Sequence, residues 1–530
     1  MIHTKKTLGG LVVAPHHLAA QAGRDVLKEG GNAVQAMVTA AAVAATVYPH
    51  MNSIGGDGFW LIKPAGQAPQ GIDASGPAAA QADAQYYISR GNPYIPSRGG
   101  LATLTVPGTL AGWEKALDFS RGWGKKLPLS LLLEPAEHYA RNGFVVSSSQ
   151  ARMGRKKISE LQKIPGFAHT FYPTGFAPSD GDILRQPRLA DTFSHLAQAG
   201  LRDFYQGDIA RTLSHFLAEQ DSPLRLADLE EYKARLCQPL SLEVAGAQLY
   251  NLPPPTQGLA SLTILGLFDR LPEAQAESFA HIHGLVESTK QAFMVRDQYC
   301  TDPKHMQLAP ETLLSDSRLA ELASRIKPRR ALFWPSQGLE GDTVWMGCID
   351  AQGNMVSFIQ SIFWEFGSGL VCPSTGVLLQ NRGVGFSLEA NHLHSLMPGK
   401  KPFHTLNPAM AVFNDGREMV YGCMGGEGQP QTQAAIFSRY AIFNQPLQRA
   451  VSAPRWLLGK SWGEDSTSLK LENRFDEDLI VQLRQAGHAV EILPEAFSDA
   501  MGHAGAAVRH ASGVMEGAAD PRADGSVACL

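Results

Sequence analysis

A threonine near the middle of the chain stands in a context that could make it a nucleophile. Thr343 lies in the segment Gly-Asp-Thr-Val-Trp-Met-Gly-Cys-Ile-Asp, directly before two runs with the alternation of β-strands. A threonine hydroxyl attacks a carbonyl poorly unless a base lies beside it, and the threonine's own α-amino group is one such base. That base exists only if the chain is cut between Asp342 and Thr343. A cut chain would be an amide-bond hydrolase that matures by self-cleavage, whereas in an uncut chain Thr343 is an ordinary strand residue.

The turn between the two runs indicates which residue faces Thr343. The segment Asp350–Asn354 has Gly353 where a three-residue hairpin loop needs a left-handed residue. If the hairpin is symmetric about Gln352, Ser361 lies opposite Thr343 on the same face, with Cβ atoms about 5 Å apart. We therefore expect the Ser361 hydroxyl within hydrogen-bond reach of the nucleophile. A slip of one residue would turn Ser361 to the other face.

A glycine-rich segment further along could bind a developing negative charge. Gly-Cys-Met-Gly-Gly-Glu-Gly (422–428) follows a strand pattern and precedes a helical one. Successive backbone N–H groups in such a turn can point at one spot, because glycine lets the chain turn sharply and approach closely. Beside a nucleophile, Gly425 and Gly426 would form an oxyanion hole; alone, the segment is a generic turn.

The composition is that of a globular protein without a nucleic-acid or membrane signature. The chain has 530 residues, 44% of them hydrophobic and 18% charged, and a net charge of −4. No basic patch, signal peptide or membrane-spanning stretch is recognisable, and the alanine-rich run 33–48 is expected to be a buried helix. Six widely spaced cysteines without a CxxC motif indicate reduced thiols. We therefore expect a cytoplasmic protein that binds neither nucleic acid nor membrane.

The hydrophobic pattern changes at Thr343 from mostly helical to mostly β. Helices are expected at 15–28 and 33–48, and then at 109–120, 129–142, 189–199, 207–219, 257–270, 275–298, 317–327 and 431–443. Strands are expected at 11–14, 240–244, 343–350, 354–361, 376–380, 409–414 and 418–423. Strands flanked by helices on both sides predict a layered α/β sandwich.

Several segments, read together, resemble the γ-glutamyltransferase family of N-terminal-nucleophile hydrolases. The match runs in nearly continuous order from about residue 10 to residue 525, which makes it more specific than any one motif. Its main segments are Leu-Lys-Glu-Gly-Gly-Asn-Ala-Val (27–34), Ser-Ile-Gly-Gly-Asp-Gly-Phe (53–59), Thr-Val-Pro-Gly-Thr-Leu-Ala-Gly-Trp (105–113), Leu-Pro-Pro-Pro-Thr-Gln-Gly (252–258), Gly-Asp-Thr (341–343), Gly-Ser-Gly-Leu-Val (367–371), Lys-Pro-Phe-His-Thr-Leu-Asn-Pro (401–408) and the Gly425-Gly426 pair.

The resemblance implies a four-layer αββα sandwich made from one precursor. Self-cleavage would give an α chain of residues 1–342 and a β chain of residues 343–530, intertwined in one catalytic domain. By position, Thr343 is the nucleophile and its freed α-amino group the base, while Ser361 stands where the family has a second threonine. Gly425 and Gly426 match the oxyanion-hole glycines. No cofactor or metal is implied, and a dimer of αβ units is a further expectation.

The departures from the family pattern concern the substrate. The arginine that binds the γ-glutamyl α-carboxylate should fall at about Ala82, and the aspartate that holds the α-amino group near Gly385. Neither is present, Phe363 replaces an asparagine, and His404-Thr405 replaces paired serines. The lid segment 387–399 is also short. Recognition of an amino acid's zwitterionic head is therefore lost.

The chain gains Arg382 in the same strip, a residue suited to bidentate binding of a carboxylate. Arg382, His404, Thr405 and Phe363 are accordingly the predicted substrate-binding residues. This combination suits a small amide with a carboxylate close to the scissile bond, and it is similar to that of family members converting oxamate to oxalate and ammonia in purine catabolism. The alternatives are a γ-glutamyl hydrolase or transferase, an acylase, and an uncleaved binding protein.

Other local patterns have structural explanations. Ser324–Lys327 fits S-x-x-K but lacks the accompanying motifs of penicillin-recognising enzymes. The pairs His281/His283 and His392/His394 have no acidic or third ligand at a familiar sequence spacing, so no metal site is predicted.

Overall fold

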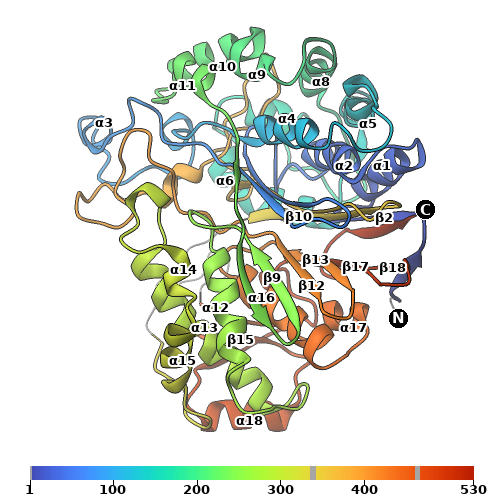
Figure 1. The fold of residues 1–530 in the computed structure, drawn as a ribbon. Coiled ribbons are helices and arrows are strands. Elements are labelled where there is room, and N and C mark those ends of the chain that lie inside the picture. Colours follow the sequence, from blue (N-terminus) through green and yellow to red (C-terminus); the bar gives the residue numbers. More distant parts are fainter. Residues whose placement is uncertain (1–2, 335–341, 460–465) are drawn as a thin grey trace.

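The computed structural model describes residues 3–334, 342–459 and 466–530. Its centre is a pair of stacked antiparallel sheets with helices on both outer faces (Figure 1). This is the predicted αββα sandwich, and the fold class is confirmed.

Each central sheet combines strands from both ends of the chain. In spatial order, the described strands of the first sheet are β19 (Ser526–Cys529), β2 (Gly10–Ala14), β10 (Asp342–Asp350), β11 (Met355–Phe363), β3 (Asp57–Lys63), β4 (Gln70–Ala74) and β7 (Arg235–Cys237). Those of the second sheet are β1 (Lys5–Thr7), β18 (Met515–Ala519), β17 (Ala504–Arg509), β13 (Glu418–Cys423), β12 (Ala409–Phe413), β9 (Ala247–Asn251) and β8 (Leu240–Val244).

The helices form the two outer layers. Above the first sheet in Figure 1 lie the helices of the N-terminal part: α1 (His17–Lys28), α2 (Ala33–Val47), α3 (Ala84–Ile88), α4 (Thr109–Phe119), α5 (Leu129–Asn142), α6 (Ser148–Leu161), α7 (Phe167–Phe171), α8 (Pro187–Ala199), α9 (Asp203–Gln206), α10 (Asp208–Glu219) and α11 (Leu226–Glu231). Beyond the second sheet lie α12 (Gly258–Phe268), α13 (Phe279–Tyr299), α14 (Pro310–Leu313), α15 (Asp316–Ser324), α16 (Gly428–Phe437), α17 (Leu447–Ser452) and α18 (Glu477–Gln485).

Short elements complete the described chain. A small sheet beside α18 contains β14 (Trp456–Leu458), β15 (Leu469–Glu472) and β16 (Val490–Leu493), and a two-stranded ribbon joins β5 (Phe144–Val145) to β6 (Ile183–Leu184). The tight helical turns are η1 (Gly100–Ala102), η2 (Pro303–His305), η3 (Arg382–Gly385), the π-type η4 (Ser438–Ile442) and η5 (Asp499–Met501).

The alanine-rich helix α2 is buried over its whole length. Its N-cap residue Asn32 accepts hydrogen bonds from the backbone N–H groups of Val34 and Gln35, and the Gln35 side chain bonds back to the N–H of Asn32. This reciprocal cap satisfies donors that a helix start otherwise leaves free. Small side chains on every face let α2 pack between the first sheet and α5. Among the described helices, none has the length and apolar character needed to span a bilayer.

One predicted strand is wrong. Residues 376–380 form only isolated bridges, of Leu378 with Val371 and of Leu379 with Gly55. The segment follows a turn in which Gly376 adopts a φ of 69° and its N–H bonds to the carbonyl of Cys372. A chain leaving this turn reaches its neighbours at single points, so no continuous ladder forms. The predicted helix 431–443 also begins earlier, as α16, and ends as the π-type turn η4.

Alternation along β10 decides which residues face the layer between the sheets. Val344 and Met346 belong to the apolar core under the helices of the first sheet, whereas Trp345 and Ile349 belong to the core between the two sheets. Since successive side chains of a strand point to opposite faces, Thr343 faces the inter-sheet layer with Trp345.

The indole of Trp345 rests on glycines of the second sheet. Gly422 of β13 and Gly505 of β17 are paired directly across their strands, and a Cβ on either residue would overlap the Trp345 ring. The indole Nε1 donates a hydrogen bond to Ser357 Oγ at 3.0 Å, which fixes the ring orientation. The glycine pair therefore lets the two sheets approach where Trp345 lies between them.

Substitution of Gly422 tests this packing. Gly422→Ala would place a methyl group inside the Trp345 ring, so we expect a loss of about 1–3 kcal/mol in the free energy of unfolding, measured by urea denaturation. Gly122→Ala is the control, because a Cβ at Gly122 meets no heavy atom within 4 Å. Equal stability of the two variants would contradict the packing argument.

Candidate active site

The hairpin β10–β11 has the predicted register. Val344 pairs with Gln360 and Ile349 with Met355, so the pairing is symmetric about the turn. Gly353 has a φ of 87°, the left-handed conformation expected at that position. Thr343 is fully buried, and its Oγ1 lies 3.3 Å from Ser361 Oγ, to which it donates a hydrogen bond.

The ladder is irregular at the predicted cleavage site. The register shifts between Asp342 and Val344, so that Asp342 pairs with Phe363. Residues 335–341, which precede this point, lie outside the described residues. Thr343 lies at this irregularity, between the pair Asp342–Phe363 and the regular ladder that begins at Val344.

Asp57 completes a row of polar side chains with Ser361 and Thr343. β3 pairs with β11 so that Asp57 lies opposite Ser361. Directly paired residues of antiparallel strands share a face. The sequence analysis gave residues 53–59 only as a segment of the family resemblance and missed Asp57. The alternation of Asp57 with Phe59 and Leu61 was the available signal, but the partner strand was not predictable from it.

The glycine loop after β13 offers free backbone donors. Gly425 and Gly426 have φ values of 109° and 52°, in the range that favours glycine. No acceptor within the described parts of the chain is recorded for either N–H group. The loop is fixed from the other side, since Gln257 Nε2 donates to the Gly426 carbonyl at 2.8 Å.

Contacts between the sheets bring this loop toward Thr343. A Cβ at Gly347 would lie 3.2 Å from Val420, and Trp345 lies against Gly422. β10 and β13 thus run in opposite directions on the two sides of the inter-sheet layer, with Gly347 near Val420 and Trp345 near Gly422. Continuing this order, we infer that Thr343 lies at the level of Met424, next to Gly425.

Arg382 is buried, and the described residues supply no hydrogen-bond acceptor for its guanidinium. It begins η3, exposes 1% of its surface, and stacks its guanidinium 4.0 Å above the ring centroid of Phe363. Its Nε and Nη2 atoms have no partner among the described residues. Burial lowers the pKa of Arg382 to about 9, against the opposing charge of Asp57, so the group is still cationic at neutral pH. Phe363 has a φ of 80°, a strained conformation for an aromatic residue.

The Asp57 carboxyl lies near this cation, and only one of its two oxygens accepts well-formed hydrogen bonds. Its Oδ1 accepts hydrogen bonds from the N–H groups of Gly76 and Gly108, at 3.1 and 3.0 Å. Its Oδ2 has no well-formed hydrogen bond in the described chain, although the Gln380 side chain lies close enough to favour the ionised form, and this oxygen is 3.6 Å from His404 Nε2. Burial raises the pKa of Asp57 to about 7, although Arg382 and the hydrogen bonds favour the ionised form.

His404 and Thr405 supply further unsatisfied polar atoms. His404 is fully buried, and neither ring nitrogen has a partner within the described ranges. Burial, with Arg382 and Lys401 adding to it, holds the pKa of His404 well below its ordinary value, so the ring is neutral. Thr405 is buried too, its carbonyl accepts from Gln257 Nε2 at 2.6 Å, and its hydroxyl has no described partner. Buried polar groups are normally hydrogen-bonded, so such a concentration indicates a site for a polar ligand.

Comparison with known proteins identifies the family of the chain. The model of the gamma-glutamyltranspeptidase family matches residues 19–530. The chain belongs to this family. It is 52% identical to the oxamate amidohydrolase proenzyme of Klebsiella pneumoniae subsp. pneumoniae, over 98% of both chains. It is 39% identical to the glutathione hydrolase-like YwrD proenzyme of Bacillus subtilis, over 97% of both.

A solved structure supports the same assignment. The cephalosporin acylase from Bacillus halodurans superposes with a TM-score of 0.92 at 31% identity, covering 100% of this chain and 97% of that chain. The predicted family and the predicted class of enzyme, a hydrolase of amide C–N bonds, are thereby confirmed.

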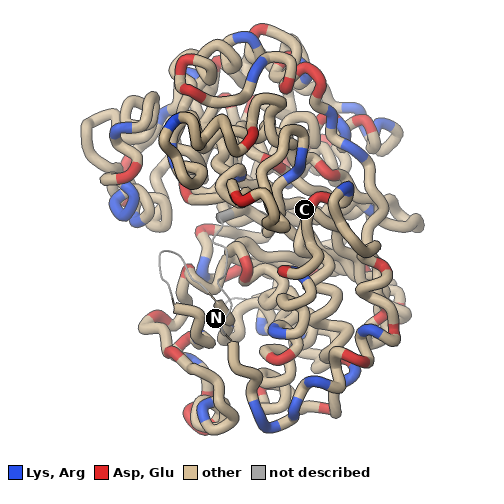
Figure 2. Tube along the Cα trace, turned by 90° about the vertical axis from the view of Figure 1, so that its left-hand side faces the viewer, with Lys and Arg blue, Asp and Glu red and all other residues tan. Residues whose placement is uncertain are grey.

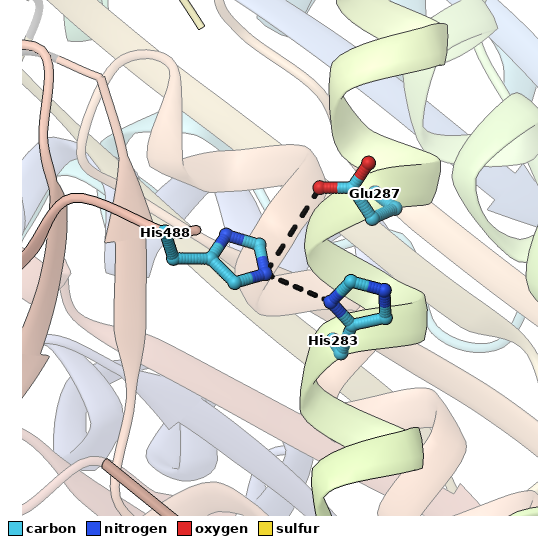
Figure 3. Close-up of side chains that lie close together, drawn as sticks. All are labelled: His283, Glu287 and His488. Atoms are coloured by element: carbon cyan, nitrogen blue, oxygen red, sulfur yellow. Dashed lines mark hydrogen bonds and ion pairs between the residues drawn. The ribbon is translucent and has the colours of Figure 1, made fainter. Parts of the chain in front are cut away.

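His283, outside this site, has close neighbours that the sequence analysis missed. Its Nδ1 lies 2.8 Å from His488 Nε2, which in turn lies 4.0 Å from Glu287 Oε1 (Figure 3). The expectation that His283 lacks an acidic neighbour is therefore wrong. Glu287 is one helical turn away on α13, so the spacing was visible, whereas His488 comes from the segment between α18 and β16.

The surroundings of these residues favour a structural network over a metal site. His283 Nε2 bonds to the Lys327 carbonyl at 2.8 Å, which occupies its second nitrogen. Glu287 Oε1 already accepts from Lys290 Nζ at 2.6 Å, and Oε2 accepts from the N–H of Leu332 at 3.0 Å. A divalent cation at this carboxylate would have to compete with a buried ammonium group. The cluster therefore ties α13 to the α18–β16 unit.

Loss of the Glu287 carboxylate should lower the stability of the protein, whereas removal of metal ions by a chelator should not. Glu287→Gln would leave Lys290, which is 2% exposed, without its anion. We expect a loss of about 3–5 kcal/mol in the free energy of unfolding, measured by urea denaturation. Glu311→Gln, at an exposed position of α14, is the control. A fall of the wild-type melting temperature after dialysis against EDTA would instead support a bound metal.

Proposed function

We propose that this protein is a self-processing amidohydrolase that converts oxamate to oxalate and ammonia. The observation that carries the proposal is the buried guanidinium of Arg382, for which the described protein supplies no acceptor. A desolvated cation of this kind is stabilised by a carboxylate ligand, which it can bind in bidentate fashion. The similarity to the oxamate amidohydrolase proenzyme supports the choice of substrate.

The proposed maturation cuts the chain between Asp342 and Thr343. The α chain would comprise residues 1–342 and the β chain residues 343–530, including β10 and β11. Both sheets interleave the two parts, because β10 and β11 lie between β2 and β3, and β12 lies beside β9. Separation of the chains would break both sheets, so the αβ unit should remain one domain.

In the proposed reaction, the freed α-amino group of Thr343 takes the proton of its own hydroxyl. Oγ1 attacks the amide carbon, and the N–H groups of Gly425 and Gly426 stabilise the oxyanion. The Ser361 hydroxyl, 3.3 Å from Thr343 Oγ1, orients the nucleophile. Ammonia leaves after the same amine returns the proton, and water then hydrolyses the acyl-threonine ester.

The pocket favours a small acid over a γ-glutamyl group. Ala82, where the family's carboxylate-binding arginine would fall, is an apolar core residue with no exposed surface. The stacked pair of Phe363 and Arg382 provides cationic recognition close to Thr343 instead. A carboxylate bound there belongs to a substrate whose acid group lies one bond from the scissile carbonyl.

The setting of the reaction is part of the proposal. All six cysteines have free thiols, which suits the reducing cytoplasm. Acidic and basic residues are interspersed over the face seen in Figure 2, which suits a small-molecule substrate better than nucleic acid. A role in purine catabolism and a dimer of αβ units complete the proposal.

Self-cleavage is tested directly on denaturing gels. Wild-type protein should run as two chains, and Thr343→Ala as one, because the variant has no hydroxyl to attack the preceding carbonyl. Thr343→Ser is the control and should still be cut. A folded wild-type protein that stays in one piece would reject the mechanism.

Ammonia release from oxamate, beside cleavage of a γ-glutamyl anilide, decides the substrate. We expect preference for oxamate in the wild-type protein. Arg382→Gln should lower kcat/KM for oxamate roughly 30-fold to several thousand-fold, which corresponds to a loss of about 2–5 kcal/mol of transition-state stabilisation. Arg121→Gln, at a side chain that is 72% exposed, should change nothing. Preference for the anilide would overturn the assignment of Arg382.

A further inference from the structure

Asp57 presents one free oxygen to the site. Its Oδ1 is occupied by the N–H groups of Gly76 and Gly108, while Oδ2 has no well-formed hydrogen bond in the described chain and points toward His404 Nε2 at 3.6 Å. The pairing of β3 with β11 puts this carboxyl in one row with Ser361 and Thr343. Oδ2 is therefore available to a molecule bound between Asp57, His404 and Arg382.

The charges around Asp57 are few. Arg382 is the cation that acts on it, and His404 is neutral. Burial raises the pKa values of the phenols of Tyr205 and Tyr232, which also face it, so both are uncharged.

Lys401 lies further out and acts on His404. Its Nζ is paired with Asp73 Oδ2 at 2.6 Å. With this lysine already neutralised, the described side chains around Asp57 carry one positive charge, that of Arg382, and either one or no negative charge, depending on the Asp57 proton.

A substrate carboxylate on Arg382 would change this balance. With Asp57 ionised, two carboxylates would share one buried cation. Like charges in such a site hold a proton between them, because both cannot be ionised without a large cost. His404, whose ring nitrogens are unpartnered, offers a neutral contact but no charge.

We propose that Asp57 is protonated when a substrate carboxylate is bound to Arg382, and that its Oδ2–H donates a hydrogen bond to that carboxylate. Asp57 is then a specificity-determining residue that makes the pocket select a monoanion and couples binding to proton uptake. This inference rests on the proposed function, whose site it specifies.

The electrostatics of the free site give the direction of the pH dependence. Burial raises the pKa of Asp57 to about 7. Below that pH the free pocket already carries the proton, and affinity is constant. Above it a proton must be taken up, so KM rises by about tenfold per pH unit until the pKa of the complex is reached. The Thr343 α-amino group affects the pH dependence in the opposite sense. It must be unprotonated to serve as base, so activity rises with pH as this group loses its proton.

The kinetic test compares wild type with Asp57→Asn between pH 6 and 10. The asparagine amide replaces Oδ2–H as a donor and cannot ionise. We expect KM for oxamate to rise above pH 7 in wild type and to stay level in Asp57→Asn, with the acidic limb of kcat/KM unchanged. Glu311→Gln, which removes an exposed carboxylate of α14, should keep the wild-type profile. A basic limb that persists in Asp57→Asn would overturn the proposal.

Calorimetry separates this inference from the proposed function. Pyruvate has the shape of oxamate but no amide, and titration at pH 8 in buffers of different ionisation heat counts the protons bound with it. We expect close to one proton in wild type and none in Asp57→Asn. No uptake in wild type, equal uptake in both, or no binding would reject the role of Asp57. If Asp57→Asn abolishes proton uptake but the wild-type protein does not hydrolyse oxamate, the role of Asp57 would be supported and the proposed function rejected.

Discussion

The packing of Trp345 on Gly422 and Gly505 is the contact on which the geometry of the site depends. The indole occupies the space that side chains at the two glycines would fill, so it sets how closely β10 and β13 approach. Thr343 is two residues before this tryptophan, and the Gly425–Gly426 loop begins shortly after Gly422. One close contact between sheets thus relates the proposed nucleophile on one chain segment to backbone donors on another.

The second constraint is electrostatic. Burying Arg382 costs folding free energy when no described residue accepts from its Nε and Nη2 atoms, and Phe363 adds backbone strain at the same place. Such costs persist where function requires them, and here they concentrate on one side of the Thr343–Ser361–Asp57 row. The core around the row is conventional, with apolar side chains between the sheets. The site is therefore a small, buried polar region within an apolar frame.

The sequence could predict the parts of the site that depend on local geometry. The β10–β11 register follows from a short turn and a glycine, and the pairing of Thr343 with Ser361 follows from the register. The family resemblance supplied the fold and pointed to Arg382. Asp57 escaped because its role depends on the pairing of β3 with β11, strands about 300 residues apart in sequence.

The His283–Glu287–His488 network escaped for a similar reason. Two of its three residues lie on one face of α13, but His488 joins through tertiary packing alone. The predicted strand at 376–380 is wrong for the opposite reason, because its residues have the right pattern but lack a continuous partner strand. Local periodicity indicates whether a segment can form a helix or a strand, whereas non-local pairing decides which residues it contacts.

The central claim is that Thr343, as a new N-terminus, carries the acyl group of a small acid amide. Mass spectrometry of the mature protein, mixed with oxamate and quenched in acid, tests it most directly. We expect one oxalyl group on the peptide that begins with Thr343. Ammonia released while that peptide stays unmodified, or a peptide that still joins Asp342 to Thr343 in active protein, would contradict the account.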